Sequence, residues 1–187
     1  MADTISFPTA ASTNTVTASN LFADDGTATT GIWDSAHADI TLSSFSSLSI
    51  PAGATIDGIE VLIEGVGNTQ AGDPEVKVYN GSSWSSNKVF LAILRKRPVT
   101  AYDPGWGANN DLWGLSWDAT TAAGIQIQID SSTMASGGRM FLDYMSVRVT
   151  YTAAASGYGN IVNGVAAASI GKVDGVATAD IEKVIGV

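Results

Sequence analysis

The chain has no cysteine and only one histidine, His37, among its 187 residues. Without cysteine it forms no disulfide and has no thiolate nucleophile, and a hydrolytic nucleophile would depend on a single imidazole as its general base. That imidazole lies in the segment Trp33–Asp39, whose small and polar residues are typical of a loop, and we interpret it as solvated. No zinc-protease, phosphate-binding or EF-hand motif occurs. We therefore expect no catalytic residue, no cofactor and no metal, and a protein that is not an enzyme.

Basic residues and long apolar runs are also scarce. Nine Lys and Arg against 18 Asp and Glu give a net charge of -9 at pH 7, whereas binding to nucleic acid phosphates needs a surplus of positive charge. No run approaches the roughly 18 consecutive apolar residues that span a membrane. The first residues lack the basic and apolar regions of a secretory signal. We therefore expect no nucleic acid partner, no membrane insertion, and assembly in a cytoplasm.

Alternation of apolar and polar residues takes the place of helical periodicity in the body of the chain. The segment 59–64 alternates with Ile59, Val61 and Ile63 on one face, and the same pattern recurs over 125–130 and 145–151. Shorter strands are expected over 76–79 and 89–94, with a hairpin signal at Asn80-Gly81. The pattern indicates strands before residue 50 but does not define their limits. It predicts an all-β sandwich, jelly roll or barrel.

The C-terminal segment repeats itself with a period of 11 residues. Val162-Asn163-Gly164-Val165 recurs as Val173-Asp174-Gly175-Val176 and again as Val184-Ile185-Gly186-Val187. Each unit has too little apolar surface to offset roughly 1–2 kcal/mol of backbone entropy per ordered residue, so its order must come from packing, most simply against other copies of the chain. The residues expected to make these oligomer contacts are Val162, Val165, Ile170, Val173, Val176, Ile181 and Val184.

Two conformations are compatible with this period. It equals about three turns of a right-handed coiled coil, but one glycine per unit costs about 1 kcal/mol relative to alanine, and Asn-Gly and Asp-Gly are tight-turn signals. We therefore favour extended segments and turns, with a short helix allowed over 178–184. The segment after Tyr151 has the small, polar composition of a linker. The expected organisation is a β domain over 1–152, a linker over 153–160 and an oligomerisation tail over 161–187.

Tryptophan is concentrated between residues 106 and 117. Trp113, Leu115 and Trp117 alternate, which would place all three on one face of a strand. Aromatic residues in this arrangement either fill the core of a sandwich or form a platform on which sugars stack. We favour core positions for Trp113 and Trp117.

Two charged segments are further candidates for binding. Phe22–Thr27 contains adjacent aspartates that suit calcium, but we favour a turn with Asx hydrogen bonds. Arg95, Lys96 and Arg97 hold three of the nine basic residues. This patch either docks on an acidic partner surface or is a solvated loop, and both interpretations stay open.

Three segments together resemble a family of tailed-bacteriophage virion proteins with jelly-roll-like β domains. They are SIPAGATIDGIEV at 49–61, DLWGLSW at 111–117 and FLDYMSVRVTY at 141–151. The tail is similar to the Val-Asn-Gly-Val-Ala repeats attached to phage tail and capsid-surface proteins. The segment 90–103 fits the family pattern poorly, which leaves the role of the basic patch open.

The resemblance implies an all-β fold, a jelly-roll-like antiparallel β-sandwich with an extended C-terminal repeat tail. It also implies a non-enzymatic virion component. The short chain, which has no fibre shaft, is similar to capsid decoration (cement) proteins. On that basis we expect a homotrimer on the capsid surface that binds the phage major capsid protein at subunit junctions. The alternatives are a phage tail-tip or fibre-base component, or a carbohydrate-binding module in which Trp106 and Trp113 face solvent.

Overall fold

The computed structural model describes residues 1–12, 18–23, 26, 39–67, 75–89, 103–130, 140–154, 172–173 and 176–177. The chain divides into two compact units, Met1–Ala153 and Ala154–Val187. The first unit holds the β body and the second holds the repeat tail. Each is considered by itself below.

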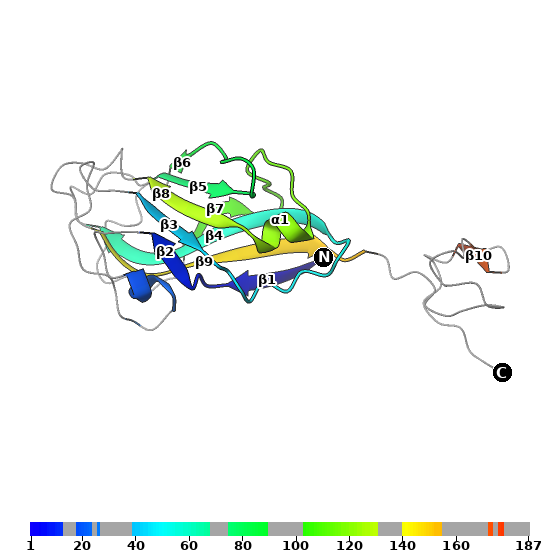
Figure 1. Cartoon of the computed structure of the whole chain (residues 1–187), viewed down its shortest axis with the longest axis horizontal. Helices are drawn as coiled ribbons and strands as arrows, with labels where there is room; N and C mark the ends of the chain where they lie inside the picture. The colour runs from blue at the N-terminus through cyan, green and yellow to red at the C-terminus, as the bar shows by residue number, and fades with distance from the viewer. Residues whose placement is uncertain are drawn as a thin grey trace. The chain divides into compact units, whose positions relative to one another are not determined.

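The β body contains two antiparallel sheets (Figure 1). The four-stranded sheet has the order β1-β9-β4-β7, and its strands are β1 (Ala2–Ser6), β9 (Met140–Thr152), β4 (Thr55–Gly67) and β7 (Asp103–Ala108). The five-stranded sheet has the order β2-β3-β8-β5-β6, and its strands are β2 (Ala10–Ser12), β3 (Ile40–Ser43), β8 (Gln126–Asp130), β5 (Glu75–Tyr79) and β6 (Lys88–Val89). The helical elements described are a 3-10 turn, η1 (Ala18–Leu21), and one short α-helix, α1 (Ala119–Ala123).

The strand order is that of a jelly roll. The short edge strand β2 can be left out and the remaining eight strands, β1 and β3 to β9, renumbered 1 to 8 in chain order. The four-stranded sheet then has the order 1-8-3-6, and the other sheet has the order 2-7-4-5. Each sheet thus alternates strands from the two halves of the chain, as the two Greek keys of a jelly roll require. The jelly-roll-like antiparallel β-sandwich expected from the sequence is confirmed.

The strands form where apolar and polar residues alternate. In β5 and β8 the buried residues are Val76, Val78, Ile127 and Ile129, and their neighbours along each strand are only partly buried. Because successive side chains point to opposite faces, each of these strands turns one apolar row toward the other sheet. The core between the two sheets also includes Leu21, Ile40, Leu42, Phe45, Ile56, Ile59, Val61, Ile63, Trp113, Ala122, Ile125, Leu142, Met145, Val147 and Val149.

β4 and β9 are the two long strands of the body and run side by side along it (Figure 1). Their pairing extends from Thr55 opposite Thr152 to Gly67 opposite Met140, with register shifts at two positions. One shift leaves Asp143 as the extra residue of a β-bulge in β9. β1 pairs with the end of β9, which brings the N-terminus beside the last residues of the body (Figure 1).

Two sequence expectations need correction. The alternation over 111–117 predicted a strand, but this segment contains a turn in which the Leu115 N–H donates to the Leu112 oxygen, with Trp113 at a φ of 58°. Of the strand expected over 89–94, Val89 lies in β6, and residues 90–94 lie outside the described part of the chain. No helix was expected in the body, yet Asp118 caps α1 by accepting a hydrogen bond from the backbone N–H of Thr121, whose side chain in turn accepts from the backbone N–H of Asp118.

The middle repeat of the tail contains a small antiparallel hairpin. β10 (Lys172–Val173) pairs with β11 (Val176–Ala177), and Asp174-Gly175 separates the two strands in the sequence. An Asp-Gly pair between two extended valines is typical of a two-residue hairpin. For these residues the extended conformation predicted from the sequence is confirmed, whereas the short helix allowed over 178–184 lies outside the described residues.

Candidate functional site

The residues predicted for assembly fall mostly beyond the described part of the chain. Arg95, Lys96 and Arg97 lie outside it, as do five of the seven expected oligomer contacts: Val162, Val165, Ile170, Ile181 and Val184. The other two, Val173 and Val176, lie in β10 and β11. His37 also lies outside the described residues.

The β10–β11 hairpin places two of the repeated valines opposite each other. Val173 is the cross-strand partner of Val176, and Lys172 is the partner of Ala177. Among the described residues this sheet has two strands, so each is an edge strand, and an edge strand presents a row of backbone N–H and C=O groups that can pair with another chain. An isolated hairpin of this size is at best marginally stable in water. The hairpin is therefore suited to gain stability from further strands.

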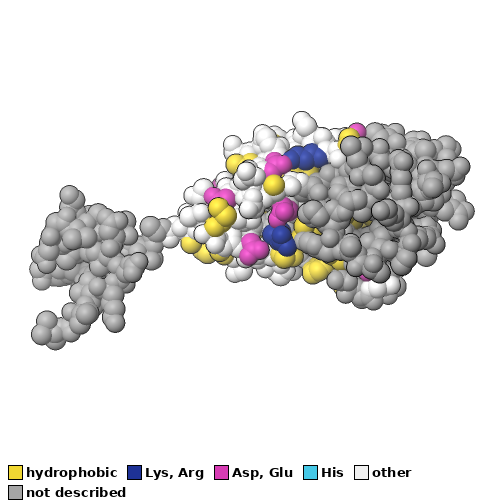
Figure 2. Space-filling view, turned by 180° about the vertical axis from the view of Figure 1, so that it is seen from behind, with side chains coloured by type: hydrophobic (Ala, Val, Ile, Leu, Met, Phe, Trp, Pro, Cys, Tyr) yellow, Lys and Arg dark blue, Asp and Glu magenta, His cyan; other side chains and the backbone are white. Residues whose placement is uncertain are grey.

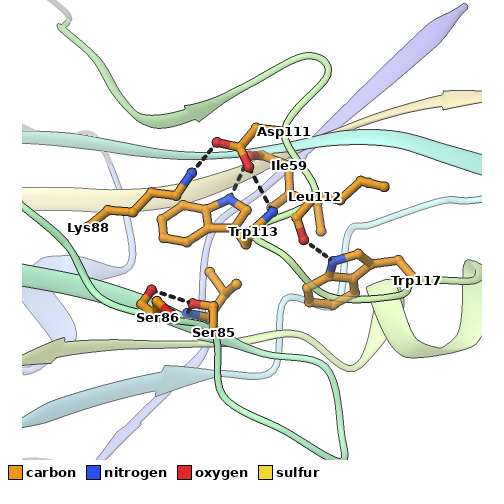
Figure 3. Close-up of polar contacts among 9 residues, drawn as sticks. Ile59, Ser85, Ser86, Lys88, Asp111, Leu112, Trp113 and Trp117 are labelled. Atoms are coloured by element: carbon orange, nitrogen blue, oxygen red, sulfur yellow. Dashed lines mark hydrogen bonds and ion pairs between the residues drawn. The ribbon is translucent and has the colours of Figure 1, made fainter.

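Trp113 is the centre of a cluster of polar contacts (Figure 3). Its indole Nε1–H donates to the backbone oxygen of Ile59 over 2.9 Å, and its backbone N–H donates to the Asp111 carboxylate over 2.7 Å. The ammonium of Lys88 lies 4.3 Å from the centre of the indole ring and forms an ion pair with Asp111. Trp113 itself is only 4% exposed. The turns over 109–117 thus place the indole between the two sheets.

Opposing effects act on the ionisation of Asp111. Burial raises the pKa of its carboxyl group, but hydrogen bonds from Lys88 and from the Trp113 backbone N–H, together with the charge of Lys88, lower the pKa more. The net result is a pKa below the usual value, so the carboxylate stays ionised at neutral pH. Asp111 therefore accepts hydrogen bonds here and has no proton to donate to a substrate.

The cluster around Trp113 is structural. The indole is buried, and its N–H is satisfied by Ile59, so the Trp113 ring offers no exposed face on which a sugar could stack. The core position predicted for Trp113 is confirmed, and a carbohydrate site in which Trp113 faces solvent is wrong. Trp117 is partly buried against the core and donates its indole N–H to the backbone oxygen of Leu112. The side chain of Trp106 lies outside the described part.

A second polar group lies on the outer face of the four-stranded sheet. Arg148 of β9 contacts Glu60 of the neighbouring β4 at 3.2 Å and Asp3 of β1 at 3.6 Å. These residues, with Met1, Ala2, Asn109 and Thr150, line an open pocket of about 280 Å³. In Figure 2, too, dark blue Lys and Arg side chains lie beside magenta Asp and Glu side chains, so positive and negative charges are mixed on the surface shown. Two carboxylates balance the guanidinium of Arg148, so the pocket offers no concentrated positive charge to an anion.

The predicted turn over Phe22–Thr27 is only partly described. Gly26 has a φ of +74°, a left-handed conformation that fits a turn, and its N–H donates to Asp143 over 3.1 Å. Asp24, Asp25 and Thr27 lie outside the described residues. Within the described ranges, no group of three or more His, Asp or Glu side chains is placed to hold a metal ion.

One aromatic cluster was missed at the level of the sequence. Trp84 lies against Tyr79 on the outer face of the five-stranded sheet, with ring centres 5.0 Å apart, and is 38% exposed. The signal that locates it is the alternation in β5: Val76 and Val78 are buried, so Lys77 and Tyr79 must face outward.

Comparison with known proteins adds no identification. No protein-family model matches the chain, and no match is found among curated proteins. In the described residues, no helix is long and apolar enough to cross a membrane. A function for this chain is therefore inferred from its residues and their geometry.

Proposed function

We propose that this chain is a non-enzymatic structural protein of a bacteriophage virion, a capsid decoration protein that assembles through its C-terminal repeats. The observation that carries the proposal is the β10–β11 hairpin within the self-similar tail. Among the described residues its two strands pair only with each other, and the same Val-x-Gly-Val sequence recurs 11 residues before it and 11 residues after it. Pairing between hairpins of different copies would add further strands to this small sheet.

The body supports a role in assembly for a different reason. It has a jelly-roll core between two sheets, so it needs no partner to bury its apolar residues. In the proposed arrangement the body contacts the major capsid protein at subunit junctions, and three tails bind one another. Tethered segments experience a local concentration on the order of millimolar. Each contact with the capsid can then be weak while the trimer stays bound.

Analytical ultracentrifugation of the full-length protein tests the self-association. We expect a trimer of 19.2-kDa chains, and we expect deletion of residues 161–187 to leave a folded monomer. The double variant Val173→Asn with Val176→Asn should weaken the trimer, whereas Lys172→Gln in the same hairpin serves as the matched control. A full-length protein that sediments as a monomer at micromolar concentration would contradict the proposal.

The second candidate is a tail-tip or fibre-base component of the phage. The resemblance of the repeats to those of phage tail proteins favours it. Copy number separates the two, because a decoration protein covers the capsid whereas a tail component is present in few copies. Gold-labelled antibody on purified virions would locate the protein on the capsid or on the tail.

A further inference from the structure

The outer face of the five-stranded sheet carries a rigid aromatic platform formed by Tyr79, the last residue of β5, and Trp84. Trp84 pairs with Tyr79 as an isolated antiparallel bridge, and the two rings are 5.0 Å apart at an angle of 37°. The ammonium of Lys77 lies 5.4 Å from the centre of the Trp84 ring. We propose that this platform binds the pyranose rings of a neutral glycan. This site is independent of the tail and of the proposed self-association.

The hairpin that carries Trp84 is held firmly by hydrogen bonds. The Tyr79 hydroxyl donates to the backbone oxygen of Gly81 over 2.9 Å, which fixes the phenol ring. The side-chain oxygen of Asn80 accepts from the backbone N–H groups of Ser82 and Ser83, and its amide nitrogen donates to the backbone oxygen of Ser116 over 3.1 Å. Binding therefore has little conformational entropy to remove from the aromatic residues, which favours affinity for a small ligand.

Polar side chains of β8 extend the platform across the sheet. Gln126 is the cross-strand partner of Tyr79, and Gln128 is the partner of Lys77. Because Ile127 and Ile129 are buried on the inner face, both glutamines project outward. Gln128 donates to the Thr41 hydroxyl over 3.1 Å, and Gln126 makes no side-chain hydrogen bond among the described residues.

This combination fits a sugar better than a protein partner. A pyranose ring has an apolar C–H face that packs on an aromatic ring and an edge of hydroxyls, each of which both donates and accepts. A glutamine amide matches those hydroxyls because it also offers donors and an acceptor side by side. A protein interface needs a larger apolar centre, whereas the neighbours of the two aromatic residues are polar: Lys77 lies over the Trp84 ring and Gln126 lies beside Tyr79.

Charge balance favours a neutral glycan over an acidic one. Lys77 lies over the indole, but Glu75 lies two residues along the same face of β5, and Asp130 of β8 is the cross-strand partner of Glu75. A single ammonium beside two carboxylates gives no net attraction for an anionic sugar. Lys77 then acts as a hydrogen-bond donor to hydroxyls.

Binding of full-length protein to a printed array of neutral hexopyranose polymers tests the site. The array holds glucans, mannans, galactans and N-acetylhexosamine polymers, and titration calorimetry with the best oligosaccharide follows. We expect Trp84→Ala to weaken binding by about tenfold or more and Gln126→Ala by severalfold. The matched control is Val89→Ala, which removes an exposed apolar side chain from β6 on the same sheet and should change affinity by less than about twofold.

Three results of the binding assays would overturn the inference. They are no binding to any glycan on the array, binding that survives Trp84→Ala unchanged, and an equal loss in Val89→Ala. Circular dichroism checks the fold of each variant. If Trp84→Ala does not fold, the binding of Gln126→Ala and Lys77→Gln is measured in its place, because these substitutions change only outward-facing strand residues. If Trp84→Ala instead dissociates the oligomer in ultracentrifugation, the platform is a contact between copies and the inference is wrong. Failure on the array leaves the proposed virion role untouched, because that role depends on the tail.

Discussion

Replacement of Trp113 by alanine should lower the free energy of unfolding of the β body by about 3–5 kcal/mol. Trp113 is 4% exposed and belongs to the core between the two sheets. Burial of an indole removes roughly 150–250 Å² from water, which at about 25 cal/mol per Å² is worth roughly 4–6 kcal/mol before the cavity relaxes. The left-handed backbone at φ 58° strains alanine and tryptophan alike, so this strain cancels in the comparison.

The phenylalanine variant separates packing from hydrogen bonding. Trp113→Phe keeps most of the apolar volume but removes the donor that satisfies the backbone oxygen of Ile59. Loss of that hydrogen bond should cost about 1–2 kcal/mol, and the smaller ring adds a modest packing loss. We therefore expect the order of stability to be wild type, then Trp113→Phe, then Trp113→Ala.

Urea unfolding of the full-length protein, followed by far-UV circular dichroism, measures these differences. The slope of the transition must stay constant for the midpoints to report stability alone. Trp84→Ala is the matched control, since it removes an indole that is 38% exposed, and it should cost only about 1 kcal/mol for the lost contact with Tyr79. A Trp113→Ala protein with the midpoint of the wild type would refute the structural role of this residue.

Three further predictions concern glycine, acid stability and the basic patch. Gly107→Ala should destabilise by about 3 kcal/mol or more, because a Cβ at a φ of +91° would lie 2.2 Å from the Ile59 oxygen; a urea midpoint like that of the wild type would contradict this. Because its pKa is lowered by folding, ionised Asp111 stabilises the body above its unfolded pKa, and this contribution is lost as pH falls through the folded pKa. Lys88→Met should therefore shift acid unfolding to higher pH in a circular dichroism titration, and an unchanged midpoint would show that the ion pair adds nothing. Replacement of Arg95–Arg97 by serines should reduce occupancy on purified capsids without unfolding the body. Occupancy of the wild type should also fall as the salt concentration rises, since exposed charges are screened over about 8 Å at physiological ionic strength. If neither change alters occupancy, the patch only keeps the protein in solution.

The strands with the clearest alternation were predictable, and those without it were not. β5 and β8 follow the alternation of buried and partly buried residues that the sequence shows. In β9, Met145, Val147 and Val149 are buried as the alternation predicts, but Ser146 and Thr150 on the opposite face are buried as well. β7 was missed because Asp103-Pro104-Gly105-Trp106-Gly107-Ala108 has the composition of a turn. Its extended conformation is stabilised by pairing with β4, a contact between distant segments that no local pattern reports.

The burial of Trp113 was predicted correctly but for the wrong local reason. Alternation with Leu115 and Trp117 suggested a strand, whereas the chain turns at Asp111, whose carboxylate accepts the Trp113 N–H. What buries the indole is a hydrogen bond to Ile59, 54 residues away, together with the space above Gly107. The outward position of Trp84 was not foreseen either, because local alternation separates two faces of a strand but does not say which neighbours share a face.

The sequence by itself determined the class of fold, the division of the chain near residue 153 and the extended conformation at Lys172–Val173 and Val176–Ala177. Each of these depends on local periodicity and composition, which do not require contacts with distant parts of the chain. The tertiary structure decided which strands lie side by side, which tryptophans are buried and where the Trp84 platform meets β8. These features depend on pairing across 40 to 90 residues, such as Val76 with Ile129 and Val61 with Val147. Such pairs form only when the two sheets close over a common core, because the free energy that selects them comes from joint burial of both partners.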